Sequence, residues 1–144
     1  MARRHHHAVR PAAALAALLL LAGCPPVTTF DPIAFAQTKG LKAEALALMD
    51  RAGEPYADHR AEVDTLRARL SRAYAREQGR PNNAKTLQQW DIVMAPQGHL
   101  LGGFLALWER RSTLDEPFID EARVQVADAF DEITGLENGK LRQD

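Results

Sequence analysis

The sequence predicts an all-α fold, a small bundle of four to five amphipathic helices that follows an N-terminal signal peptide. After residue 31, apolar residues recur at spacings of three and four, which is the period of a helix with one buried face. No segment alternates apolar and polar residues as a half-buried strand does. A stretch of roughly 110 residues is long enough for one hydrophobic core. We therefore expect a single helical domain over residues 32–144.

The first helix is expected from about Pro32 to Ala52. Asp31 is a favourable N-cap, and proline suits the first helical position because the backbone N–H is not needed there. Gly40 weakens the middle of this helix by about 1 kcal/mol relative to alanine, so its first turns could form a separate piece. Gly53 ends it. Its apolar stripe consists of Leu41, Ala45, Leu48 and Ala52, with Met49 beside it.

The second helix is expected to begin at Pro55 and to end before Gly79 and Pro81. Its first half is acidic and its second half basic, an order that complements the helix dipole at both ends. Its apolar residues are spaced alternately by three and four, which is the pattern of a heptad seam. This seam consists of Tyr56, His59, Val63, Leu66, Leu70 and Ala73.

Two short helices and a long one complete the predicted domain. Asn82 and Asn83 can cap a third helix, which Pro96 ends, and a fourth is expected from about His99 to Arg111. The fifth is expected from about Glu116 to Leu136. The three long helices would pack along their seams, and the two short ones would cover the opening between them. The expected seam of the fifth helix consists of Ile119, Ala122, Val126, Ala129, Ile133 and Leu136.

Residues 1–23 have the layout of a secretory signal peptide. Three arginines and no acid precede an almost pure Ala/Leu stretch over residues 11–22. About a dozen helical residues span roughly 18 Å, well below the ~30 Å of a bilayer core, so a transmembrane helix is not expected. The three histidines at positions 5–7 belong to this leader, and we expect no metal site from them.

The leader ends in Leu21-Ala22-Gly23-Cys24, which resembles the lipobox of bacterial lipoproteins. This resemblance implies that the Cys24 thiol receives a diacylglyceryl group and that the chain is cut before it, leaving an amine that is usually acylated too. Two or more acyl chains hold a protein stably on a membrane. Residues 24–31 would be the lipidated cysteine and a short tether. Pro25, in place of an aspartate, favours the outer membrane if the host is Gram-negative.

Composition argues against several functional classes. With 18 basic and 19 acidic residues, the chain has no basic excess for binding nucleic acid. One cysteine excludes an intrachain disulfide and a cysteine-rich zinc site. Beyond the leader, His59 and His99 are the plausible general bases, and no serine stands in a nucleophile elbow. We expect neither an enzyme nor a bound metal or cofactor.

Gly102 and Gly103 form an unusual pair inside a short apolar helix, where they cost about 2 kcal/mol in helix propensity. Two explanations remain open. Either another helix approaches closely or the helix is kinked, or the glycines form the floor of a groove for a partner helix or an acyl chain. In the second case Trp90, Phe104 and Trp108 would be its walls.

A basic stripe on the second helix is the other candidate binding feature. It consists of Arg69, Arg72 and Arg76 and could extend to Arg80, and an acidic stripe of Glu121, Asp128 and Glu132 lies on the fifth helix. The two stripes could face each other or be solvated. Alternatively, the arginines could contact anionic headgroups, cell-wall polymer or an acidic partner.

The leading hypothesis is a lipid-anchored, non-enzymatic interaction or scaffold protein, or an assembly factor, of the bacterial envelope. Its partners would be the membrane, through the anchor, and another envelope protein. The alternative is a carrier of a small apolar ligand or lipid, with its pocket near Trp90, Gly102, Gly103 and Trp108. An enzyme is the least favoured of the three.

Overall fold

The computed structural model describes residues 28–142, and over that span it has five helices and no strand. The predicted all-α bundle is confirmed. Cys24, the leader and the last two residues lie outside the described residues. The helices are α1 (Pro32–Met49), α2 (Tyr56–Gln78), α3 (Ala84–Met94), α4 (Leu101–Arg111) and α5 (Glu116–Lys140).

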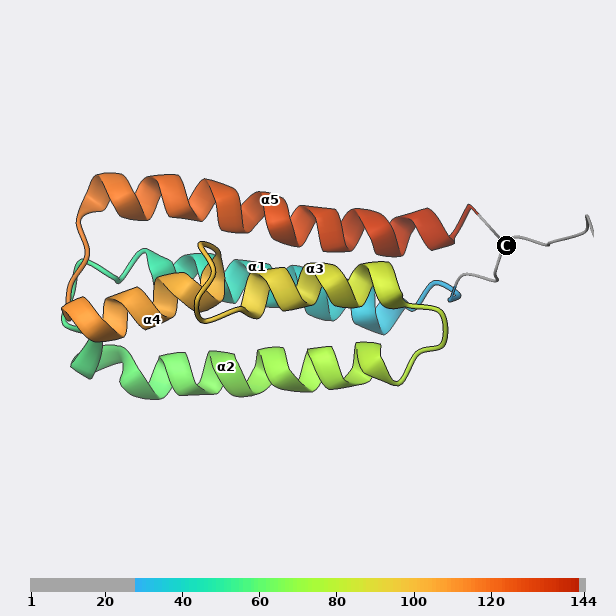
Figure 1. The fold of residues 1–144 in the computed structure, drawn as a ribbon, viewed down its shortest axis with the longest axis horizontal. Helices are drawn as coiled ribbons and strands as arrows, with labels where there is room; N and C mark the ends of the chain where they lie inside the picture. The colour runs from blue at the N-terminus through green and yellow to red at the C-terminus, as the bar shows by residue number, and fades with distance from the viewer. Residues whose placement is uncertain (1–27, 143–144) are drawn as a thin grey trace, which may run out of the picture.

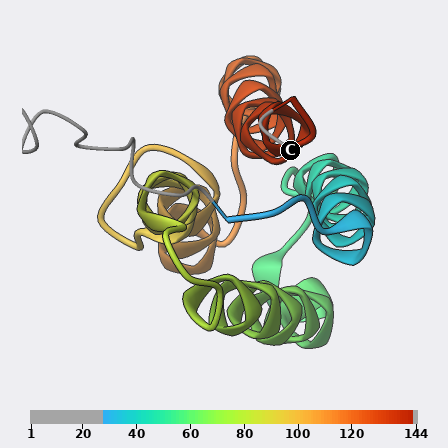
Figure 2. The ribbon, with the colours of Figure 1, turned by 90° about the vertical axis from the view of Figure 1, so that its right-hand side faces the viewer.

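The five helices form four columns, because α3 and α4 follow one another in the same direction along one side of the bundle (Figure 1). Seen from the end, the columns are arranged in the order α1, α2, α3–α4 and α5 (Figure 2). Short connections make neighbouring columns antiparallel. The α3–α4 column packs against α2 and α5, so it completes the fourth side of the bundle, as expected for the two short helices.

Local sequence signals place most of the helix starts and seams. The Asp31 carboxylate accepts hydrogen bonds from the N–H groups of Ile33 and Ala34, and the Asp115 carboxylate caps α5 in the same way. All six residues of the predicted α2 seam are buried, and so are the five apolar residues expected to be buried in the first helix. Gly40 does not interrupt α1, which is continuous.

Several boundaries differ from the prediction. Helix α1 ends at Met49 rather than Ala52, and the residues after it form a turn. Helix α4 begins at Leu101 rather than His99. Asn83 makes no side-chain cap for α3, because its amide oxygen accepts from Lys140 instead, while its amide nitrogen donates to Glu77.

The largest correction concerns α5, which continues past Asn138 and Gly139 to Lys140. Its buried face includes Phe130 and Glu137, where the sequence pattern had placed Ala129 and Leu136. The extra helical turn places two charged side chains, those of Glu137 and Lys140, inside the end of the bundle, where tertiary partners stabilise it.

Those partners form an ionic network around Arg80. Its guanidinium donates to both carboxylate oxygens of Glu137 on α5, to Glu77 on α2 and to the carbonyl oxygen of Thr29 in the tether. Lys140 donates to Glu137 and Asn83. Two cations and two anions are thus balanced at a site where Glu77, Glu137 and Lys140 are 3–4% exposed. Burial is tolerated because each charge is paired and hydrogen-bonded.

The network also fixes the entry of the chain into the bundle. The backbone N–H of Asp31 donates to the Glu137 carboxylate (2.6 Å), and Asp31 accepts from Arg76 on α2 (2.8 Å). The segment that leads into α1 is therefore held against both α2 and α5. We call this end of the bundle, with residues 28–31, the tether end and the opposite one the distal end.

At the distal end, two loops are joined through the main chain. The N–H of Tyr56 donates to the carbonyl of Ser112 (2.7 Å), and the N–H of Leu114 donates to the carbonyl of Ala52 (2.8 Å). These two hydrogen bonds hold the α1–α2 connection against the α4–α5 connection, so the distal end is closed by backbone contacts.

The junction of α3 and α4 explains the glycine pair. A Cβ on Gly102 would collide with the backbone carbonyl of Met94, and one on Gly103 would collide with the carbonyl of Gly98. The first turn of α4 therefore lies directly against the end of α3 and the loop that follows it. Close approach of the chain's own backbone therefore accounts for both glycines.

We predict that Gly103→Ala lowers the free energy of unfolding by about 2 kcal/mol, because an overpacked methyl group forces the backbone apart. The matched control is Gly135→Ala on α5, where a Cβ has open space. That change should be neutral or stabilising by up to about 1 kcal/mol. Urea unfolding of both variants tests this. Equal stability of the two variants would contradict the close packing.

The second prediction concerns Glu137. Burial raises the pKa of its carboxyl. Hydrogen bonds from Arg80, Lys140 and the Asp31 N–H together lower the pKa by more than burial raises it, so the pKa lies below the ordinary value of 4.5. A depressed folded-state pKa adds stability above the unfolded-state pKa, and that stability is lost as the pH falls through the folded value.

Glu137→Gln should therefore destabilise the protein by about 3 kcal/mol at neutral pH, because the buried Lys140 and the partly buried Arg80 lose their shared anion. The difference from wild type should shrink as the pH falls below about 4.5. Glu132→Gln, an exposed change on the same helix, is the control and should have little effect. Urea unfolding over a pH series measures both. A difference independent of pH would argue against the ionic role.

Candidate functional site: the groove between α1 and α2

The three aromatic residues expected to wall a groove lie in the core instead. Trp90, Phe104 and Trp108 are 1%, 2% and 0% exposed. Trp90 packs edge-on against Phe130, with 6.0 Å between ring centroids, and Trp108 packs edge-on against Tyr56 at 5.5 Å. The two glycines contact the chain's own backbone, and each also lines a hollow of about 270 Å³, Gly102 beside Met94 and Gly103 beside Phe104.

The two histidines lie apart. His59 is buried, its Nε2 is 2.7 Å from a carboxylate oxygen of Glu54, and its ring lies against Trp108 near the end of α4. A hydrogen bond from Arg51, and to a smaller extent one from His59, lowers the pKa of Glu54 to about 2. His99 is exposed in the loop before α4. The structure does not bring the two histidines into one site.

The basic stripe on α2 faces α1 rather than the acidic stripe. Arg69 pairs with Glu44 (2.6 Å) and Arg76 pairs with Asp31 (2.8 Å). Helices α2 and α5 are diagonal in the bundle (Figure 2), so the two stripes do not face each other. Arg72 lies between the two pairs and has no ionic or hydrogen-bonding partner among residues 28–142.

The outer faces of α1 and α2 enclose a groove that the sequence analysis missed. Its lining residues recur every three or four positions on both helices, and the Glu44–Arg69 ion pair divides it into two hollows. We call them the distal groove, of about 470 Å³, and the tether-end groove, of about 660 Å³. The distal groove is lined by Glu44, Ala47, Leu48, Arg51, Ala61, Glu62 and Thr65. The tether-end groove is lined by Pro32, Ile33, Ala36, Gln37, Gly40, Leu41, Arg69, Arg72, Ala73 and Arg76.

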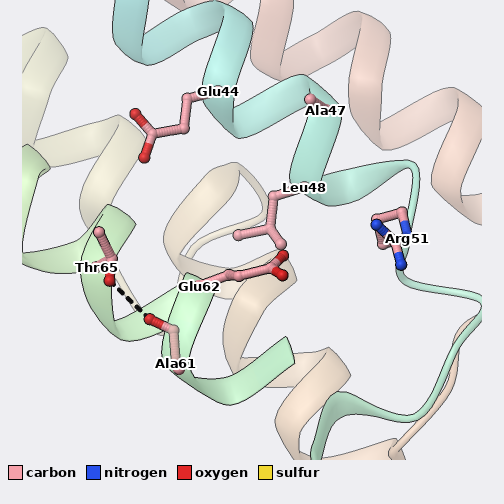
Figure 3. A pocket seen from close by; sticks show the side chains of 7 residues that line it. All are labelled: Glu44, Ala47, Leu48, Arg51, Ala61, Glu62 and Thr65. Atoms are coloured by element: carbon pink, nitrogen blue, oxygen red, sulfur yellow. Dashed lines mark hydrogen bonds between the residues drawn. The ribbon is translucent and has the colours of Figure 1, made fainter. Parts of the chain in front are cut away.

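Small side chains make the distal groove accessible to another backbone. Ala47 on α1 and Ala61 on α2 leave the space between the helices open, and Leu48 lies between them (Figure 3). The hydroxyl of Thr65 donates to the carbonyl of Ala61, so its own hydrogen-bonding need is met. Glu62 and Glu44, the latter already paired with Arg69, give the rim two carboxylates, and Arg51, which pairs with Glu54, gives it one cation. A helix with small or apolar residues on one face and basic residues at its edges would fit this surface.

Charge is unevenly divided along the bundle. The half at the tether end, made up of residues 28–43, 69–94 and 129–142, has nine basic and six acidic side chains. The distal half, residues 44–68 and 95–128, has six basic and twelve acidic side chains. The tether end is therefore net positive and the distal end net negative. A charge asymmetry of this kind orients a molecule in the field of a charged surface or partner.

Comparison with protein-family models, curated proteins and solved structures gave no significant match. No helix between residues 28 and 142 is both long and apolar enough to cross a membrane. Over the same span, no cluster of three or more His, Cys, Asp or Glu residues is arranged to hold a metal ion.

Proposed function

We propose that this chain is a lipid-anchored, non-enzymatic protein of the bacterial envelope whose distal groove binds a helix of another envelope protein. The observation that carries the proposal is the position of the lipobox-like cysteine relative to the bundle. Cys24 stands four residues before Thr28, the first described residue. Four extended residues span at most about 14 Å. A lipid on Cys24 would thus keep the tether end close to the bilayer.

With the tether end at the membrane, the distal groove is on the far half of the bundle, accessible from the aqueous side. Its small residues allow a partner helix to approach closely, and its carboxylates favour a helix with basic residues. The net negative charge of the distal half adds long-range attraction for such a partner. Since Pro25 follows the cysteine, the periplasmic face of the outer membrane is the location favoured in a Gram-negative host.

The anchor is tested by Cys24→Ser in the native host or a related one. Wild-type protein should fractionate with membranes, and its N-terminal peptide should begin at Cys24 with the added mass of acyl chains. The variant should lose the lipid and leave the membrane fraction when the membranes are washed with about 0.5 M salt, which removes electrostatic binding but not an acyl anchor. Intact mass spectrometry and fractionation measure this. A wild-type mature protein with an unmodified thiol would contradict the anchor.

Partner binding is tested by placing a photocrosslinking residue at Thr65 in the distal groove or at Val124, an exposed residue of α5. Crosslinks to one envelope protein should form from position 65 and not from position 124. Ala61→Trp should fill the groove and reduce that crosslink at least about tenfold, a loss of about 1.4 kcal/mol in binding. Val124→Trp is the matched control and should leave it unchanged.

Three outcomes would argue against the distal groove as the binding surface. These are equal crosslinking from both positions, an undiminished crosslink in a folded Ala61→Trp variant, and no specific product from position 65. Circular dichroism of each variant shows whether the bundle is intact, so loss of folding is distinguished from loss of binding.

A further inference from the structure

We infer that the tether-end groove binds the phosphate headgroups of anionic lipids, so that only the tether-end half of the α1–α2 face contacts the bilayer surface and the distal groove stays on the aqueous side. This inference deepens the proposed function, because the lipid anchor would bring the groove to the membrane. It assigns a ligand to a surface separate from the distal groove.

The first argument is the arrangement of the three arginines. Arg69, Arg72 and Arg76 follow one another at spacings of three and four, and all three line the same side of the largest hollow described above. Arginine guanidinium groups match phosphate oxygens in geometry and donate two parallel hydrogen bonds. This wall of the groove is therefore suited to phosphate.

The second argument is the incomplete pairing of these charges. Acids contact the arginines at the two ends of the row, where Glu44 pairs with Arg69 and Asp31 with Arg76. None of the residues that line this groove is acidic. Arg72, in the middle, is exposed and has no partner within the part of the chain that the structure describes. An anion entering the groove would meet one available guanidinium flanked by two more.

The third argument is the distance to the membrane. The groove begins at Pro32 and Ile33, only eight or nine residues after Cys24, and residues 28–31 are held against the bundle. Only residues 25–27 and the peptide bonds beside them separate the cysteine from Thr28, a reach of about 14 Å. An acylated cysteine would thus place the groove within reach of the headgroups.

Two further features agree with a lipid surface. The tether-end half of the bundle is net positive, and an anionic leaflet attracts positive charge. Ile33, at the edge of the groove, is 54% exposed, and an apolar side chain in this position can enter the interfacial layer. An acidic protein segment could also pair with the arginines, but the lipid anchor would bring the groove to a bilayer and not to such a segment.

The experiment uses the chain from residue 24 to residue 144 with Cys24→Ser, which has no lipid and contains every residue of the bundle. Flotation is measured with neutral phosphatidylcholine vesicles and with vesicles that contain about 30% phosphatidylglycerol. We expect binding to the anionic vesicles, little to the neutral ones, and loss of binding at about 0.5 M salt, where charges are screened within a few ångström.

Arg72→Gln should lower the partition coefficient on anionic vesicles about fivefold. Each Lys or Arg near an anionic surface contributes about 1 kcal/mol to binding, and this variant removes one. The matched control is Arg111→Gln, which removes the same charge from an exposed residue of the distal half. It should change the partition coefficient less than twofold. Circular dichroism checks that both variants remain folded.

Three results would overturn the inference. The first is absence of binding to anionic vesicles, and the second is equal loss in the two variants, which would indicate a net-charge effect without a site. The third is binding to polyglutamate but not to vesicles, which would assign the groove to an acidic protein segment. The Cys24→Ser protein used in the flotation experiment has no lipid anchor. A negative result would therefore overturn lipid binding by the tether-end groove without testing the Cys24 anchor or the distal groove.

Discussion

The ionic network around Arg80 is the constraint on which the arrangement of the bundle depends. One guanidinium joins the tether at Thr29, the end of α2 at Glu77 and the end of α5 at Glu137, segments that are far apart in the sequence. The network therefore holds the tether against the ends of α2 and α5. Buried charges of this kind are stable only as a complete set, because a single unpaired ion costs several kcal/mol. Because residues 28–31 are held there, a lipid on Cys24 would act on this end of the bundle as a whole.

Much of the fold was predictable because it depends on local patterns. The α2 seam and the cap at Asp31 were identified from residue spacing and side-chain type alone. The end of α5 was not. Asn138 and Gly139 favour a stop, and what extends the helix is the pairing of Glu137 with Arg80, which is 57 residues away in the chain. A pattern within one helix contains no information about that partner.

The candidate site was predictable only in part, for the same reason. The arginine stripe was visible in the sequence, but its neighbours were not, and the structure places it beside α1 instead of α5. The aromatic residues and the glycine pair were noticed for their rarity, yet their explanation is core packing and close backbone contact. Predicting a groove between two helices requires knowing which helices are adjacent. The recurring alanines and glycine on the outer face of α1 were the one available signal.

The closure of the distal end has a consequence for how this protein can change over evolutionary time. The two loops there are joined by main-chain N–H and carbonyl groups of Ala52, Tyr56, Ser112 and Leu114. Main-chain hydrogen bonds do not depend on side-chain identity, so exposed loop positions without side-chain partners, such as Gly53 and Thr113, can mutate at little cost to folding. Descendants of this chain could therefore acquire new recognition at that end while the rest of the bundle stays the same.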